Sequence, residues 1–304
     1  MRDTVNNQRY ETATICLMLV KGVGYKTIDG FWKWMDAEGH TAPKSLEELH
    51  ALSSSKISKI PLLPVFEEHW NEAISIIEHC ESEGYHLLGR SNPIPTKFLS
   101  IEKPPLLLFV EGNLDALLAH SIAVVGARGV SDLGAKIGRE MTAMIARKGW
   151  CIVSGLATGC DTVAHKAALQ AEAQTVAIIP TGLGKIYPAE NKNLARDILR
   201  SGGCLVSEYL PGKAPNNRAF IERDRLQSAG SDALFVLETK LNGGTMHTVQ
   251  YAQDHGRPIA VLKPNSSEAE ESYMQGNHSL IAENKAVSID GNASLLSFLE
   301  TSVN

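Results

Sequence analysis

The sequence predicts an α/β protein in which helices cover both faces of a parallel sheet, preceded by a small all-helical domain. From residue 106 onward, short apolar runs alternate with longer amphipathic segments. Strands that are apolar throughout are typical of a parallel sheet buried on both faces. The apolar runs are 106–110, 122–125, 151–153, 175–179, 204–206, 233–237 and 258–262. The main amphipathic segments are 134–148, 162–171, 191–200 and 246–254.

The first hundred residues have a different pattern, in which strands are scarce. Ile28, Phe31 and Trp32 recur at helical spacing, and a second amphipathic stretch covers 66–83. The segment 91–105 contains four prolines and is expected to be a linker. The sequence therefore predicts a helical domain over 1–95 and a sheet-containing domain over 96–304.

The composition limits the class of protein. Of the 304 residues, 43% are hydrophobic and 21% charged, which is typical of folded domains. No apolar run approaches the ~18 residues that span a bilayer, and the first ten residues are polar, so we expect a cytoplasmic protein with no membrane contact. The five cysteines form no C-x-x-C pair, which excludes a zinc ribbon and a disulfide scaffold.

The charge is distributed unevenly. The net charge is -5, but residues 101–262 hold 17 basic and 15 acidic side chains, whereas residues 1–100 hold 10 and 13. A surface that binds phosphate is therefore expected only as a local patch in the middle of the chain.

Several familiar chemistries lack their motifs. The glycines that follow 122–125 do not have the G-x-G-x-x-G spacing of a dinucleotide site, and Ala135 stands where a P-loop requires lysine. Ile152 stands where the nucleophile elbow before Ser154 requires glycine. His165 is expected to be a packed residue, since no nucleophile is near it in the sequence. We therefore expect no catalytic residue, no cofactor and no metal.

Glycines and small polar residues follow several of the predicted strands, at 126–128, 154–161, 181–191 and 242–245. Backbone amides and helix N-termini in such loops bind anions without a large net charge, and the loops gather at the carboxyl ends of parallel strands. The segment before 233 adds Arg218, Arg223 and Arg225 around Phe220. Cations beside a stacking ring are typical of sites for single-stranded nucleic acid.

The stretch 20–27, with Gly22 and Gly24, resembles the turn of a helix-hairpin-helix motif, whose amides hold a DNA phosphate. The alternative is that these glycines only connect two helices. We treat this stretch as a secondary DNA contact.

A series of motifs between residues 100 and 290 resembles the DprA (Smf) family of DNA-processing proteins. The series includes 123–128, 153–157, Tyr187-Pro188 with Asn191, Phe220 with Arg223 and Arg225, and Gly243 with Thr245. The resemblance implies an extended Rossmann-like fold that binds single-stranded DNA at the strand ends and forms a homodimer, without catalysis. It also implies a role in DNA processing, recombination and natural transformation, with a RecA-type recombinase as partner. The residues assigned to nucleic-acid binding are Arg128, Ser154, Gly155, Lys185, Tyr187, Asn191, Lys192, Arg218, Phe220, Arg223, Arg225, Gly243, Gly244 and Thr245.

Two acidic residues affect the roles expected at this site. The family's usual Arg-Asn-Arg is replaced by Arg223-Asp224-Arg225, which places an acid between two expected phosphate ligands. Asp161 is expected to cap a helix that begins near Thr162.

Two further classes of function stay open at this point. The Lonely Guy phosphoribohydrolases have a related fold, but they carry a glutamate shortly after their glycine-rich loop, whereas 242–245 leads into Met246, His247 and Thr248. A sensor that binds a nucleotide-derived ligand in the same pocket is the other alternative.

Overall fold

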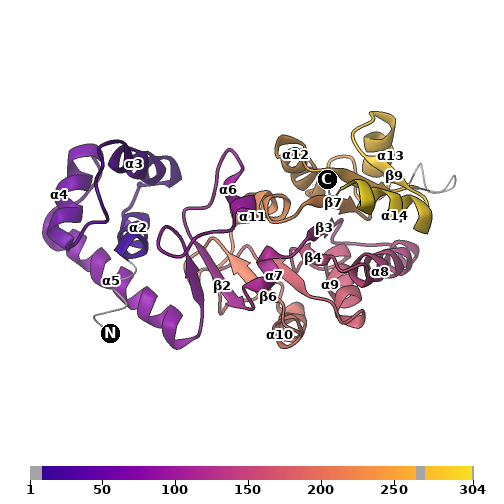
Figure 1. The fold of residues 1–304 in the computed structure, drawn as a ribbon, viewed down its shortest axis with the longest axis horizontal. Helices are drawn as coiled ribbons and strands as arrows, with labels where there is room; N and C mark the ends of the chain where they lie inside the picture. Colours follow the sequence, from indigo (N-terminus) through magenta and orange to yellow (C-terminus); the bar gives the residue numbers. More distant parts are fainter. Residues whose placement is uncertain (1–8, 265–270, 303–304) are drawn as a thin grey trace. The chain divides into compact units, whose positions relative to one another are not determined.

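The computed structural model describes residues 9–264 and 271–302. The chain divides into two compact units (Figure 1). Unit 1 comprises Met1–Ile94 with Pro105–Phe109, and unit 2 comprises Pro95–Pro104 with Val110–Asn304. Within the described ranges, no helix is both long enough and apolar enough to span a bilayer.

Unit 1 consists mainly of the helices α2 (Arg9–Leu19), α3 (Tyr25–Ala37), α4 (Leu46–Lys56) and α5 (Leu63–Ser82). The apolar positions at helical spacing form its core, since Ile28, Phe31 and Trp32 are at most 2% exposed. The indole nitrogen of Trp32 donates to the Thr14 hydroxyl at 3.1 Å, which satisfies its one polar atom. A short strand, β1 (His86–Leu88), follows α5. The expectation of an all-helical region omitted this strand.

The turn between α2 and α3 contains Gly22, whose φ of +83° lies in the left-handed region that favours glycine. The Lys59 ammonium donates to the Gly22 carbonyl at 3.2 Å. A DNA contact at this turn remains a prediction.

The sheet of unit 2 contains β3 (Ser121–Val125), β4 (Cys151–Ser154), β5 (Thr175–Ile178), β6 (Cys204–Ser207), β7 (Ala233–Val236), β8 (Ile259–Leu262) and β9 (Val287–Ile289). These strands lie in the order β6-β5-β4-β3-β7-β8-β9, and each neighbouring pair is parallel. Every residue of β3 to β8 is buried, as the uninterrupted apolar runs predict. A further strand, β2 (Leu108–Gly112), crosses the boundary between the units.

The strand order reverses between β3 and β7. Strands β4 to β6 extend the sheet to one side of β3, whereas β7 to β9 extend it to the other. The crossovers through α8 (Asp132–Arg147) and α12 (Thr245–Asp254) therefore run in opposite directions, and the right-handed rule places these helices on opposite faces. The switch point between β3 and β7 is where such a sheet binds ligands.

Helices cover both faces of this sheet. On one face α8 contacts α9 (Cys160–Gln170) and α14 (Asn292–Thr301), and α9 also contacts α10 (Lys192–Arg200). On the other face α11 (Asn217–Ala229) packs against α12, which contacts β7 and β8. The core beneath α8 and α9 joins Ile145, Ile152 and Phe235, each fully buried. The α/β fold class with helices on both faces is therefore confirmed.

Helix α11 is the main element that the sequence analysis missed, because it treated this segment as a connection. The buried side of α11 carries Arg223, Arg225, Gln227 and Ser228, so no apolar stripe at 3.6-residue spacing marks it. Its first turn is capped by Asn216, whose side chain accepts from the Ala219 amide at 3.0 Å. The expected linker contains a short helix, α6 (Thr96–Leu99), while β9, α13 (Gln275–Ala282) and α14 were not placed in advance.

Candidate functional site

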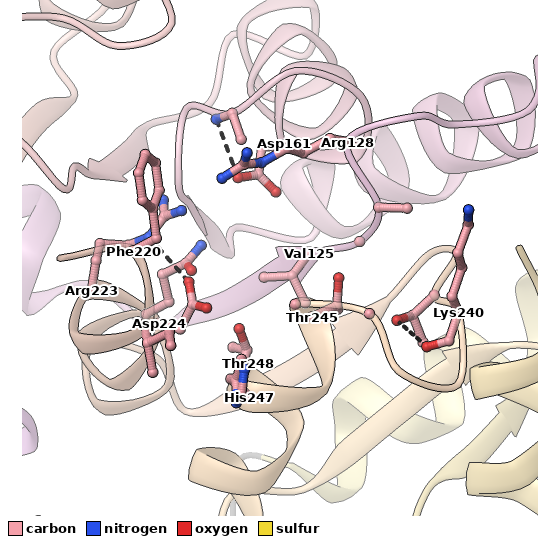
Figure 2. A pocket seen from close by; sticks show the side chains of 18 of the residues that line it. Val125, Arg128, Asp161, Phe220, Arg223, Asp224, Lys240, Thr245, His247 and Thr248 are labelled. Carbon is pink, nitrogen blue, oxygen red and sulfur yellow. Dashed lines mark hydrogen bonds and ion pairs between the residues drawn. The ribbon is translucent and has the colours of Figure 1, made fainter. Parts of the chain in front are cut away.

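A pocket of about 570 Å³ opens at the switch point. One side is the carboxyl end of β3 with the loop that follows it, and the other sides are α11 and the loop between β7 and α12 (Figure 2). The side chains that determine its chemistry are Arg128, Asp161, Phe220, Arg223, Asp224, Gln227, Lys240, Thr245, His247 and Thr248. Its volume lies within the range of ligand sites in proteins.

Groups that attract anions line part of this pocket. Arg128 and Lys240 are exposed, and neither forms an ion pair with a described carboxylate. Gly243 and Gly244 lead into Thr245, the first residue of the ten-residue helix α12, and no side chain caps the amides of its first turn. The amides of Met246 and His247 donate to the Gly243 and Gly244 carbonyls at 3.0 Å, so it is the positive end of the helix dipole, together with the two exposed cations, that favours a phosphate group here.

An aromatic pair lies beside these cations. The guanidinium carbon of Arg128 is 4.9 Å from the centroid of the Phe220 ring, and Phe220 meets Tyr187 edge to face with a centroid separation of 5.5 Å. A second pocket, of about 190 Å³, also has Arg128 and Phe220 in its lining, together with Tyr187 and Gly155. Arg128 and Phe220 therefore belong to both pockets.

Arg223 connects α11 to the ends of β4 and β5. Its Nη1 donates to the carbonyls of Gly155 at 2.5 Å and Ile178 at 2.9 Å, and its Nε lies 3.2 Å from Asp224 Oδ1. When the Gln227 amide is oriented to satisfy both its atoms, it donates to Asp224 Oδ1 at 3.0 Å and accepts from the Gly155 amide at 2.9 Å. A β-carbon at Gly155 would overlap Arg223 Nη1, so the network requires glycine there.

The electrostatics of the pocket are set by two acids beside this arginine. Burial raises the pKa of Asp161, and the Arg223 charge only partly opposes the effect. Burial likewise raises the pKa of Asp224 to about 6; Arg223 and His247 lower it, while Asp161 raises it further. Two carboxyl groups lie beside one buried guanidinium, so the part of the pocket beside α11 is not cationic.

Eight of the fourteen residues predicted for nucleic-acid binding line these two pockets. Arg128, Phe220, Arg223, Gly243, Gly244 and Thr245 line the larger pocket. Gly155 and Tyr187 line the smaller one. The structure therefore brings together side chains that are separated by more than a hundred residues of sequence.

The structure corrects the expected roles of Ser154 and Asn191. Ser154 is fully buried, and its hydroxyl donates to the Val124 carbonyl at 2.7 Å. The Asn191 amide is also buried and donates to the Leu156 carbonyl at 2.8 Å and the Thr162 hydroxyl at 2.9 Å. Both side chains hold neighbouring loops in place, and neither presents a polar atom to a ligand.

Arg225 is likewise turned inward. Its side chain is 3% exposed, and it donates to Glu208 at 2.6 Å and to the Lys103 carbonyl at 2.5 Å. A guanidinium satisfied in this way stabilises unit 2 and is not available to a phosphate. Arg223 and Arg225 were both expected to be phosphate ligands. Both side chains are buried, and Arg223 lines the pocket whereas Arg225 does not.

Three predicted cations are exposed but line neither pocket. Lys185 lies in the loop after β5, Lys192 is the first residue of α10, and Arg218 lies in the first turn of α11. Arg218 Nε is 3.2 Å from Glu222 Oε1, and its side chain is 83% exposed. Contacts of these three residues with DNA remain predictions.

Sequence reasoning missed Lys240, His247 and Gln227 as pocket residues. Lys240 follows β7 in the same way that Arg128 follows β3, so its position after a buried strand was an available signal. His247 and Gln227 depended on the packing of α11 against α12 and had no signal of their own. Asp161 does not cap from outside its helix: it lies in the first turn of α9 and accepts from the Ala157 amide at 3.2 Å.

The described part of the chain holds no group of three or more His, Cys, Asp or Glu side chains arranged for a metal ion. All five cysteines are buried and unpaired. His165 is a packed residue, as expected: its Nδ1 lies 2.7 Å from the Thr175 hydroxyl, and burial lowers its pKa to about 3.

The fold and the pocket define a Rossmann-like protein whose switch point presents cations, helix amides and an aromatic ring. Residues 86–300 match the family of DNA recombination-mediator protein A. This match covers more than half of the chain, and the chain belongs to that family.

The similarity extends to named relatives. The chain is 38% identical over 183 residues to protein Smf of Escherichia coli, an alignment that covers 60% of this chain and 49% of that protein. The chain therefore spans about half the length of this relative.

Two solved structures are similar to the fold. The structure of DNA processing protein A from Streptococcus pneumoniae matches with a TM-score of 0.76 at 28% identity and covers 95% of this chain and 97% of its own. DNA processing protein A from Helicobacter pylori matches with a TM-score of 0.64 at 27% identity and covers 72% and 95%. The Helicobacter pylori structure is described as revealing a unique mode of single-stranded DNA binding.

Proposed function

We propose that this protein binds single-stranded DNA in the switch-point pocket and acts in DNA processing and recombination through binding rather than catalysis. The observation that carries the proposal is the contact of Arg128 with Phe220, 4.9 Å from cation to ring centroid, in the pocket that the N-terminus of α12 also lines. Membership of the recombination-mediator family and the single-strand binding described for the Helicobacter pylori protein support it.

The phosphate and the base of a nucleotide each have a counterpart in this pocket. The phosphate is held by the guanidinium of Arg128 and the ammonium of Lys240, and the positive N-terminal end of α12 adds to the attraction. The base stacks on Phe220, which lines the larger pocket. Because paired bases within a duplex are stacked and cannot enter a pocket, the site favours single strands.

The remaining partners belong to the same proposal. A RecA-type recombinase that receives the strand, a homodimer, a cytoplasmic location and a role in natural transformation are supported by the resemblance to the DprA family. Separate folding of a helical domain (1–95) and an extended Rossmann-like domain (96–304) is likewise proposed, from the change of sequence pattern near the prolines.

Binding of labelled oligo-dT and of a matched duplex across a salt series tests the proposal. We expect the single strand to bind more tightly, with an affinity that falls as salt rises by about 0.7 logarithmic units per phosphate contact and tenfold change in salt. Equal binding of duplex and single strand, or no binding at low salt, would contradict it.

A further inference from the structure

The larger pocket contains a carboxylate that phosphate binding does not use. Asp224 lies on α11 with its side chain 14% exposed, and Figure 2 shows its carboxylate turned into the space beside the end of β3. Oδ1 is engaged by Arg223 Nε and by the Gln227 amide. Oδ2 forms no hydrogen bond or ion pair with any residue in 9–264 or 271–302, and Asp224 is among the residues that line the pocket.

The charges of the pocket fix the direction in which a nucleotide enters. Two acids, Asp161 and Asp224, surround the buried Arg223, whereas the unpaired cations Arg128 and Lys240 are exposed. A phosphate is repelled by the acids and attracted by the exposed cations. The phosphate therefore stays with Arg128 and Lys240, and the base points toward Asp224.

From this geometry, and resting on the proposed function, we propose that Asp224 selects the base: it accepts hydrogen bonds from an unpaired base with an exocyclic amino group, guanine above all, and disfavours thymine. An ionised carboxylate only accepts hydrogen bonds. Guanine offers two adjacent donors, N1–H and the N2 amino group. Thymine offers N3–H between two carbonyl oxygens, which the carboxylate repels. An asparagine side chain, by contrast, both donates and accepts and so does not discriminate in this way.

The ionisation of Asp224 at neutral pH is compatible with this role. Burial raises its pKa to about 6, and the ionisable groups that affect it are Arg223, Asp161 and His247. At pH 8 the group is therefore a carboxylate, and measurements at that pH avoid its titration.

The test compares pentanucleotides that differ only at the centre. The affinities of the unmodified protein for TTTTT, TTGTT and TTITT are measured at pH 8 and one salt concentration, where I is deoxyinosine, which lacks the guanine N2 amino group. The phosphates are identical, so the ratios report the base alone. We expect TTGTT to bind about tenfold more tightly than TTTTT, the size of one good base contact, and TTITT to lie between them.

Two variants assign the selection to one carboxylate. Asp224→Asn should bring the ratio of TTGTT to TTTTT affinity close to one, chiefly by improving TTTTT binding. Asp197→Asn removes the same charge on α10, where the side chain is 56% exposed and lines neither pocket, and should leave the ratio unchanged.

The outcomes separate this inference from the proposed function. If the unmodified protein binds TTTTT and TTGTT equally, base selection is wrong while single-strand binding stands. If it binds neither, the proposed function itself fails. A ratio that survives in folded Asp224→Asn would overturn the assignment to Asp224. The pentanucleotide series needs no variant, and it still tests base selection if Asp224→Asn does not fold.

Discussion

Replacement of Arg128 by alanine removes the exposed cation that lies on the Phe220 ring. Arg128 forms no ion pair with a described residue, so the loss to the free protein is limited to the cation–π contact, about 0.5–1 kcal/mol. This is small against a typical free energy of unfolding of about 5–15 kcal/mol. The variant should therefore fold, and its effect should appear in binding.

The magnitude follows from the loss of one phosphate contact. The dependence of log Kd on log salt should fall by about 0.7 for a single strand. For a fourfold rise in salt, the parent protein then weakens about 2.6-fold more than the variant does. At low salt we expect the variant to bind about tenfold more weakly, since a charge-assisted hydrogen bond contributes about 1.5–3 kcal/mol and this one is exposed.

Fluorescence anisotropy with labelled oligo-dT at four or more salt concentrations measures both quantities. Arg139→Ala is the matched control. It removes the same charge, but Arg139 is exposed on α8 and lines neither pocket. If folded Arg128→Ala binds like the parent at every salt concentration, or if Arg139→Ala changes the slope as much, the phosphate is held elsewhere.

Four further predictions concern stacking, folding and pH. Phe220→Ala should weaken single-strand binding by about 1–3 kcal/mol with little change in salt slope; a slope change as large as that of Arg128→Ala would refute a stacking role. Arg225→Ala should lower the free energy of unfolding by about 3–5 kcal/mol because it leaves Glu208 largely buried without its partner; denaturant unfolding measures this, and a loss below about 1 kcal/mol would contradict it. His165 has a pKa of about 3 in the folded chain against 6.5 in the unfolded chain. The stability that its neutral form contributes is therefore complete above pH 6.5 and is lost as pH falls toward 3. Between pH 8 and 5 the free energy of unfolding of the parent should fall by about 2 kcal/mol more than that of His165→Asn, and equal falls would refute this. A fragment of residues 96–304 should fold and keep most of its single-strand binding, and insolubility, or loss of binding by a folded fragment, would count against separable domains.

The sheet was predictable because burial on both faces leaves an uninterrupted apolar run. The runs at 122–125 and 233–237 each match an observed strand to within a residue, and both lie beside the switch point. Helix α11 was not predictable in the same way. Four of its seven buried positions are polar, and they are satisfied by contacts that only the folded chain creates, such as that of Arg223 with the Ile178 carbonyl.

The candidate site was predictable where position along the chain decides exposure. Arg128 comes three residues after the end of a buried strand, so it is expected beyond the carboxyl ends of the strands, and the structure places it in the pocket lining. Arg225 has the same side chain but faces Glu208 inside unit 2. Residue type alone does not reveal which way a guanidinium points, and the same limit applies to the buried Ser154 hydroxyl.

Photo-crosslinking tests the location of the bound strand most directly. A single-stranded oligonucleotide carrying 5-iodouracil is bound to the protein at low salt, and the complex is irradiated. The crosslinked protein is then digested with a protease, and mass spectrometry identifies the residue attached to the oligonucleotide. We predict attachment to Phe220 or Tyr187, the aromatic pair beside Arg128, and its loss at high salt. Attachment only to residues of unit 1, or a pattern of attachment that Phe220→Ala leaves unchanged, would contradict the placement of single-stranded DNA at the switch point.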